Sequence, residues 1–125
     1  MALVNQVKKV VRMELWDIIK FQIQIHCNLN KISITDQNVE CLTLLALTGE
    51  MELGAFCNKT AELSIFKNAQ SARAALPVLE KKGLIYTFKQ GKDKKRIKLH
   101  KDLIVLNKGN ILLDYKIARV ESTTA

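Results

Sequence analysis

Apolar and polar residues alternate over a long stretch near the start of the chain. Between residues 10 and 29 most odd-numbered positions are apolar and most even-numbered positions are polar, with Asp17 as the main break. A period of two is typical of a β-strand with one buried face. We therefore predict a strand or a bent hairpin, most clearly over Lys20–Cys27. A helix through Val11–Lys20 is the alternative interpretation.

Two helices are predicted next. Thr35 and Asp36 can cap a helix N-terminus, because their side-chain oxygens accept hydrogen bonds from unpaired backbone N–H groups. The residues that follow are so rich in apolar side chains that this helix, ending at Gly49, is predicted to be buried nearly all round. A second, shorter helix is expected over Glu50–Asn58, and Lys59–Lys67 is expected to be a connection without regular structure.

A third helix leads directly into a predicted β-hairpin. It begins at the capping residue Asn68 and repeats small and aliphatic residues at the spacing of one helix face. Gly83 ends it. Leu84–Lys89 and Lys94–Lys101 then form two predicted strands, joined by a tip that contains the glycine a tight hairpin loop needs.

Further short strands are predicted near the C-terminus. Leu103–Leu106 and Ile111–Val120 flank a turn signal at residues 107–110. The strand at Lys20–Cys27 could pair with Ile111–Val120 inside the chain, or terminal strands could extend the sheet of a neighbouring subunit. Both possibilities stay open at this point.

The net charge of the chain is concentrated in the third helix and the hairpin. Residues 67–101 contain eleven lysine and arginine residues and only two acidic residues, Glu80 and Asp93, so this stretch carries +9 whereas the whole 125-residue chain carries +8. A field concentrated in this way attracts a polyanion or an acidic protein surface.

Alternation along the second hairpin strand predicts a cationic ribbon. Three cations would project from one face while two aliphatic residues pack beneath, which suits contact with a phosphate backbone. The predicted outward residues are Lys94, Arg96 and Lys98, and the inward residues are Ile97 and Leu99. Tyr86 and Phe88, on the first hairpin strand, could stack on bases, but we favour core packing for both rings.

Nothing in the sequence favours catalysis or metal binding. The three cysteines, Cys27, Cys41 and Cys57, form no Cys-x-x-Cys pair, so we expect buried free thiols in a reducing compartment. No carboxylate recurs with a nucleophile or histidine at a catalytic spacing, and no phosphate-binding glycine loop is present. The longest apolar stretch is too short for a membrane, and no signal peptide is visible. We expect no enzymatic activity, no cofactor, no metal site and no membrane association.

The order helix–helix–helix–hairpin, with the third helix ending in Leu79–Ile85 (LEKKGLI), resembles the winged helix-turn-helix family. The resemblance covers roughly residues 36–101 and is most specific over Ala69–Lys98. This part of the chain is similar to MarR-type regulators and to winged-helix replication initiators of plasmids. It implies an α+β fold of three helices and a basic hairpin wing. Extra strands would lie in residues 1–31 and 102–125 of a single domain, 1–125.

The same resemblance implies which residues would bind nucleic acid. In the family, the third helix enters the major groove and the wing follows the phosphate backbone. By this correspondence Gln70, Ser71 and Arg73 would lie near base edges, and the cations of the wing would contact phosphates. The residues carried over are Gln70, Ser71, Arg73, Lys81, Lys89, Lys92, Lys94, Lys95, Arg96 and Lys98.

The outward face of the third helix departs from the family pattern. Ala74, Pro77 and Val78 share one face, and none of them can donate a hydrogen bond to a base edge. Pro77 also removes a backbone donor and should bend the helix. Because a small exposed apolar patch on a helix is typical of a protein contact, we predict that these three residues form a protein interface.

Two stretches, Ile65–Ile85 and Lys108–Lys116, resemble small winged-helix proteins encoded by tailed bacteriophages. This resemblance implies a non-enzymatic structural subunit of the virion, a ring or connector protein of the portal–tail region. Its partners would be neighbouring virion subunits, further copies of itself and, through the wing, DNA. The alternative hypothesis is a winged-helix DNA-binding transcriptional regulator or replication initiator in the host-cell cytoplasm. We favour the first because the third helix lacks base-reading side chains.

Overall fold

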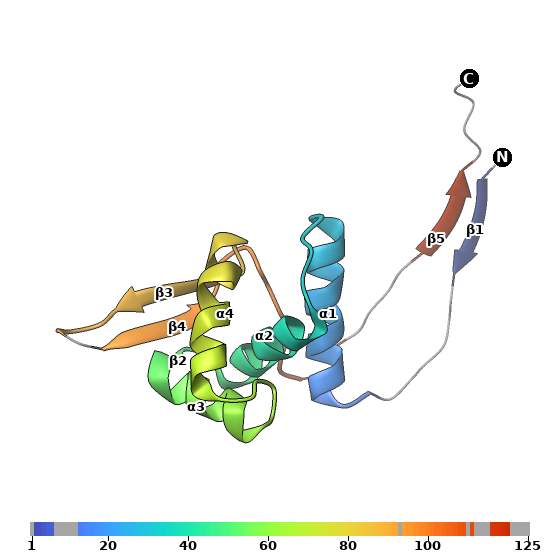
Figure 1. The fold of residues 1–125 in the computed structure, drawn as a ribbon. Helices are drawn as coiled ribbons and strands as arrows, with labels where there is room; N and C mark the ends of the chain where they lie inside the picture. The colour runs from blue at the N-terminus through green and yellow to red at the C-terminus, as the bar shows by residue number, and fades with distance from the viewer. Residues whose placement is uncertain (1, 7–12, 93, 110, 112–115, 121–125) are drawn as a thin grey trace.

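The computed structural model describes residues 2–6, 13–92, 94–109, 111 and 116–120. Its helices and strands lie in two groups, a helical body with a projecting hairpin and a separate pair of terminal strands (Figure 1). In chain order the described elements are β1 (Ala2–Gln6), α1 (Leu15–Leu29), α2 (Asp36–Thr48), β2 (Met51–Glu52), α3 (Leu53–Glu62), α4 (Ala69–Lys81), β3 (Ile85–Lys89), β4 (Lys95–Leu99) and β5 (Lys116–Val120).

The hairpin belongs to a three-stranded antiparallel sheet in the order β2-β4-β3. Met51 of β2 lies opposite Ile97 of β4, and Ile85 of β3 lies opposite Leu99. Three helices, α2 to α4, with the short strand β2 between α2 and α3 and the hairpin β3–β4 after α4, make up a winged-helix fold. The predicted α+β fold class is confirmed.

The core lies where α1 to α4 meet the sheet. Every residue of the α2 segment 41–46 is buried, which confirms that this helix is enclosed nearly all round. Phe56 of α3, Leu79 of α4 and Ile97 of β4 are each 0% exposed and join the elements around α2. The loop before α4 also contributes buried side chains to this cluster.

Side-chain caps hold two of the predicted helix starts. The Thr35 hydroxyl oxygen accepts a hydrogen bond from the backbone N–H of Asn38 at 3.2 Å. The Asn68 amide oxygen likewise accepts from the N–H of Ser71 at 2.8 Å. Because such caps satisfy donors that have no partner inside the helix, both helices begin at the predicted residues. Gly83 follows α4 with φ of 75°, the left-handed conformation that ends a helix.

The strand predicted at Lys20–Cys27 is wrong, because this segment lies inside α1. The residues of α1 that are buried, Ile19, Ile23 and Cys27, are spaced four apart and therefore lie on one helix face. The same residues satisfy an alternating pattern, since a spacing of four is also a multiple of two. The apolar residues between them, such as Phe21 at 42% exposure, stay largely outside the core. The helix alternative was placed at Val11–Lys20, and α1 extends beyond it.

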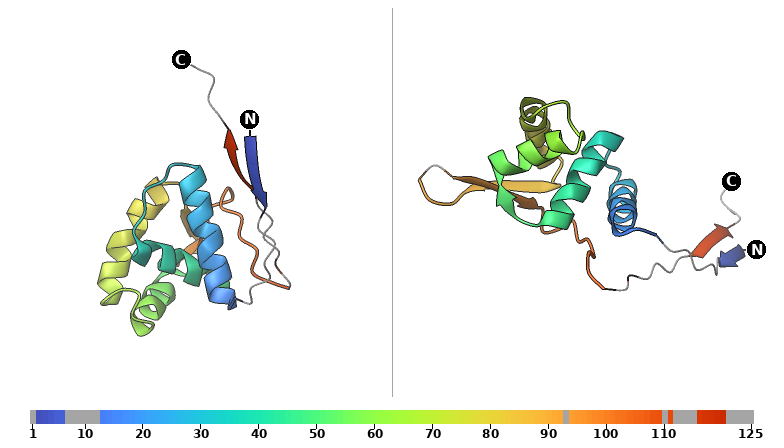
Figure 2. Two further views of the ribbon diagram at one scale, coloured as in Figure 1. Left: turned by 90° about the vertical axis from the view of Figure 1, so that its right-hand side faces the viewer. Right: turned by 90° about the horizontal axis from the view of Figure 1, so that it is seen from below.

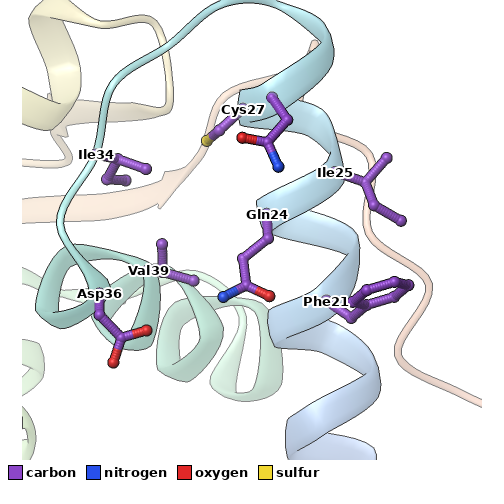
Figure 3. Close-up of a pocket in the computed structure, with 8 residues that line it drawn as sticks. Phe21, Gln24, Ile25, Cys27, Ile34, Asp36 and Val39 are labelled. Carbon is purple, nitrogen blue, oxygen red and sulfur yellow. The ribbon is translucent and has the colours of Figure 1, made fainter.

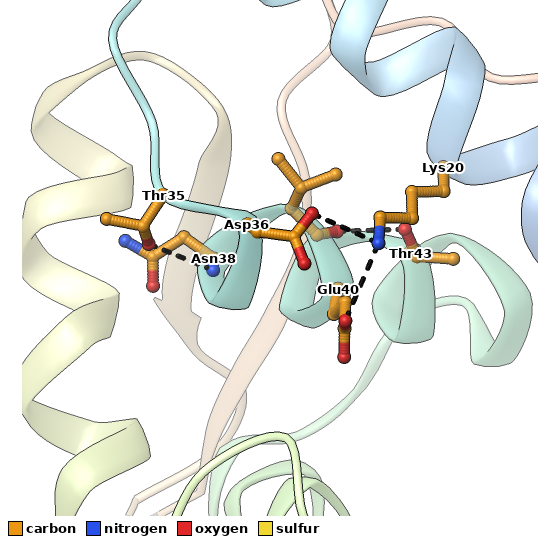
Figure 4. Close-up of polar contacts among 7 residues, drawn as sticks. Lys20, Thr35, Asp36, Asn38, Glu40 and Thr43 are labelled. Carbon is orange, nitrogen blue, oxygen red and sulfur yellow. Dashed lines mark hydrogen bonds and ion pairs between the residues drawn. The ribbon is translucent and has the colours of Figure 1, made fainter.

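A cation joins α1 to α2 (Figure 4). The Lys20 ammonium lies 3.0 Å from a carboxylate oxygen of Asp36 and 3.5 Å from one of Glu40. The hydrogen bond to Asp36 raises the pKa of Lys20 above its ordinary value, and the carboxylate charges act in the same direction against the smaller effect of burial. This ion pair lies at the edge of the contact between the two helices, whose buried residues belong to one core.

The second predicted helix is displaced along the chain. It was expected over Glu50–Asn58, whereas α3 begins at Leu53 and continues to Glu62, inside the segment predicted to be a connection. Met51 and Glu52 are instead drawn into the sheet as β2, because they pair with β4. Phe56 and Cys57 of α3 are both buried in the core, and Leu53 is half-buried.

Strands at both ends of the chain are confirmed, although the N-terminal strand is not the predicted one. β1 pairs antiparallel with β5, Ala2 lying opposite Val120, and the pair stands apart from the helices (Figures 1 and 2). Of the predicted strand Ile111–Val120, the structure has Lys116–Val120, and residues 112–115 lie outside the described part of the chain.

The strand predicted at Leu103–Leu106 is wrong, because this segment is irregular and side chains of α1 and of the adjoining Asn107 hold it in place. The Gln22 side chain donates to the Leu106 carbonyl oxygen at 2.8 Å and accepts from the Leu106 N–H at 2.9 Å. Asn107 donates to the Ala46 carbonyl oxygen at 2.7 Å. These contacts hold the segment against α1 and α2 in place of a neighbouring strand.

Candidate nucleic-acid interface

The wing lies where the sequence predicts it, at β3–β4, and its cations reach solvent. Ile97 is 0% exposed and Leu99 is half-buried, so the predicted inward residues of β4 are confirmed. Five lysines of the hairpin are exposed and Arg96 is half-buried, whereas Asp93 lies outside the described residues. The exposed lysines are Lys89, Lys92, Lys94, Lys95 and Lys98.

The two wing strands present two different sides. We call the side that packs toward α4 the helix side; it carries Thr87 and Lys95, which together with α4 residues line one cleft. The opposite side, which we call the open side, carries Tyr86, Phe88, Arg96 and Lys98; Tyr86 lies opposite Lys98 in the strand register and Phe88 opposite Arg96. Arg96 and Lys98 of the predicted ribbon therefore share the open side, whereas Lys89 and Lys95, which the family resemblance added, lie on the helix side.

A cleft of about 320 Å³ separates α4 from the helix side of the wing. Its two cations are Arg73 of α4 and Lys95 of the wing. At its floor, Glu80 accepts hydrogen bonds from the Thr87 hydroxyl at 2.8 Å and from the Thr87 N–H at 3.3 Å. These bonds fasten β3 to α4 and so fix the angle between helix and wing. The lining residues are Leu53, Arg73, Leu76, Pro77, Glu80, Thr87 and Lys95.

The predicted nucleic-acid residues of α4 are spread along the helix and do not all lie at the cleft. Gln70 and Arg73 are exposed in its first turns. Ser71 is half-buried and its hydroxyl donates to the Asn68 side chain at 3.1 Å, so it helps to cap the helix. Lys81 is exposed at the opposite end of α4, about 12 Å along the axis from Arg73 at the usual rise per residue. The wing cleft thus gathers Arg73 with Lys95 and leaves Lys81 apart.

The apolar patch predicted on α4 is exposed. Ala74 and Pro77 are exposed, and Val78 is 47% exposed. The helix continues through Pro77 to Lys81. The role of this patch as a protein interface stays a prediction.

Two features of the open side were not predicted. The Arg96 side chain is bound by Glu50, whose carboxylate oxygen lies 2.9 Å from the Arg96 Nε atom. Tyr86 and Phe88, for which core packing was favoured, are half-buried on the open side, away from the core. The wrong prediction has a plain cause: Ile85 and Thr87, which alternate with the two rings, take the helix side.

A second cleft, of about 390 Å³, lies between α1 and the start of α2 (Figure 3). None of its lining residues is basic, so it does not attract a polyanion. In the part of the chain that the structure describes, no cluster of histidine, cysteine, aspartate or glutamate has the arrangement of a metal site. Among the described helices none is both long and apolar enough to cross a membrane.

Comparisons with known proteins add one structural similarity. No family model matches the chain, and no curated protein matches it. A solved structure of the ferric uptake regulator Fur of Helicobacter pylori is similar over 90% of this chain and 75% of the Fur chain, at 15% identity and a TM-score of 0.49. We draw no functional conclusion from a similarity of this size.

Proposed function

We propose that the chain is a non-enzymatic winged-helix protein that binds duplex DNA, with α4 and the helix side of the wing acting as one surface. The observation that carries the proposal is the cleft in which Arg73 of α4 and Lys95 of β4 face the same space. Lys89 lies directly opposite Lys95 in the strand register and adds a third cation beside it.

Phosphate contact is the chemistry that this surface supports best. Cations that neutralise phosphates release the counterions condensed on DNA, and this release supplies most of the affinity that does not depend on sequence. Arg73 can contact two phosphate oxygens at once, whereas the lysines act as mobile point charges. Gln70, also exposed in the first turns of α4, is the candidate for contact with a base edge.

The proposal is tested by the salt dependence of duplex binding. Lys89→Ala combined with Lys95→Ala removes two phosphate contacts, so the slope of log affinity against log salt should become shallower by about 1.8. The matched control combines Lys59→Ala with Lys108→Ala, two exposed lysines outside residues 67–101. Fluorescence anisotropy with a labelled duplex at several salt concentrations measures both. If the two double variants change the slope equally, the wing is not the contact.

In its more specific form, the proposal is that the chain is a sequence-specific transcriptional regulator or replication initiator that acts in the host-cell cytoplasm. Such a protein loses about 1–3 kcal/mol of binding free energy for each mismatched base pair. The virion-subunit hypothesis, with its ring assembly and homo-oligomer, stays a prediction. Its one structural support is the exposed α4 patch at Ala74, Pro77 and Val78.

A further inference from the structure

The open side of the wing combines aromatic rings with cations. Tyr86 and Phe88 are two residues apart on β3, so they project from the same side about 7 Å from each other. Lys98 and Arg96 lie directly opposite them on β4. Helices α3 and α4 lie on the other side of the hairpin, and no described helix covers this one (Figure 2). Both rings remain half-buried because their neighbours on the sheet shield them.

Lys98 covers both rings. Its ammonium nitrogen lies 5.2 Å from the centre of the Phe88 ring and 5.9 Å from the centre of the Tyr86 ring. The other side chain against Tyr86 is His100, stacked at 4.3 Å between ring centres. Tyr86 is therefore held by two neighbours, whereas Phe88, nearer the tip, has only the flexible lysine over its face among the described contacts.

The charges on the open side favour an anionic ligand near β3. The acidic residues near this side include Glu50, which is engaged with Arg96, and Asp102, whose carboxylate lies 3.5 Å from the Nδ1 atom of His100, the ring stacked on Tyr86. Within the described part of the chain, none of the ion pairs includes Lys98. Phe88 lies two residues nearer the wing tip than Tyr86 and is therefore the ring further from Asp102.

We propose that the open side binds the unstacked bases of single-stranded nucleic acid, with Phe88 as the stacking surface and Lys98 as the phosphate contact. A base offers Phe88 a flat π-face to stack on, which the lysine ammonium lacks, and the displaced ammonium gains a phosphate beside the stacked base. This ligand differs from the duplex proposed for the helix side, and the two sides use different side chains. The wing would therefore contact paired strands on one side and an open strand on the other.

The test compares two single strands of equal charge with each other and with a duplex. The strands are an oligothymidylate of about 15 nucleotides and an abasic oligonucleotide of the same length. Stacking requires bases, so the wild-type chain should bind the oligothymidylate about tenfold more tightly than the abasic strand. Equal affinities for these two strands would overturn the proposal without any variant.

The discriminating variant is Phe88→Leu, which keeps an apolar side chain and removes the flat ring. It should weaken binding to the oligothymidylate by about tenfold and leave the abasic strand and the duplex unchanged. Thermal unfolding followed by circular dichroism verifies that the variant folds. Equal weakening for all three ligands would assign Phe88 a structural role and contradict the proposal. The double variant Lys89→Ala/Lys95→Ala separates this inference from the function proposed above. It should lose duplex binding while still binding the oligothymidylate more tightly than the abasic strand.

Discussion

The helix side and the open side of the wing are built from the same two strands but have opposite properties. On the helix side, Ile85 and Ile97 are 1% and 0% exposed and belong to the core. On the open side, their neighbours Tyr86 and Lys98 pack against each other and against His100 and Phe88, outside the core, and Lys98 is exposed. Successive strand residues alternate between the sides, so residues that stabilise the fold and residues available for binding are interleaved one by one.

The largest difference between the two sides should appear in chemical access. Cys27, Cys41 and Cys57 are each at most 1% exposed in the core. Burial, together with the neighbouring Cys57, raises the pKa of Cys41 to about 12, which suppresses its reactive thiolate. Alkylation by iodoacetamide at neutral pH should therefore be slower in the native protein than in guanidinium by on the order of a thousandfold or more.

Mass spectrometry of the alkylated protein resolves the three sites. The lysines of the wing provide the internal control, because an amine-reactive acetylating reagent should modify exposed Lys98 in the native protein without delay. Rapid native alkylation of Cys41 or Cys57 would show that the body opens easily. The contrast between a closed side and an open side would then be wrong.

Neighbouring residues of β4 should differ next in their effect on stability. Ile97→Ala removes a fully buried side chain and leaves a cavity, so the free energy of unfolding should fall by about 2–4 kcal/mol. Lys98→Ala removes an exposed cation over two rings and should cost at most about 1 kcal/mol. Urea denaturation of both variants measures the difference. Similar losses would mean that the open side contributes to the core as much as the helix side.

Much of the fold was predictable because local signals decide it. Asn68 and Gly83 mark the start and end of α4 through a side-chain cap and a left-handed residue, and both act without help from distant contacts. The first helix shows the opposite case. Ile19, Ile23 and Cys27 fit a helix face and an alternating strand equally well, and only packing against α2 distinguishes the two.

The candidate site was predictable in part for the same reason. Alternation along β4 correctly predicted that Ile97 points inward. Ile97 lies opposite Thr87 of β3, so the same alternation places Tyr86 and Phe88 on the other side. A stricter use of that alternation would have placed both rings on the open side. The pairing of Arg96 with Glu50 depends on the meeting of β2 and β4, which no local pattern specifies. Only the structure therefore shows that Arg96 is paired with a carboxylate, whereas Lys98 is in none of the ion pairs of the described residues.

The smallest expected effect concerns Glu80, the carboxylate that lines the cleft between α4 and the helix side of the wing. Glu80→Gln removes a negative charge beside Arg73 and Lys95 but keeps an oxygen that accepts from Thr87. Since the carboxylate repels phosphates, duplex affinity should increase by about two- to fivefold, and binding to a single strand on the open side should not change. Glu80→Ala is the control: it removes the same charge and also the hydrogen bonds to Thr87, so it should match the gain in affinity but lose about 1 kcal/mol of stability. Anisotropy titrations with duplex and oligothymidylate measure the affinities, and urea denaturation measures the stabilities. If Glu80→Gln leaves duplex binding unchanged, DNA does not enter this cleft, and the helix side would hold the wing in place without contacting the ligand.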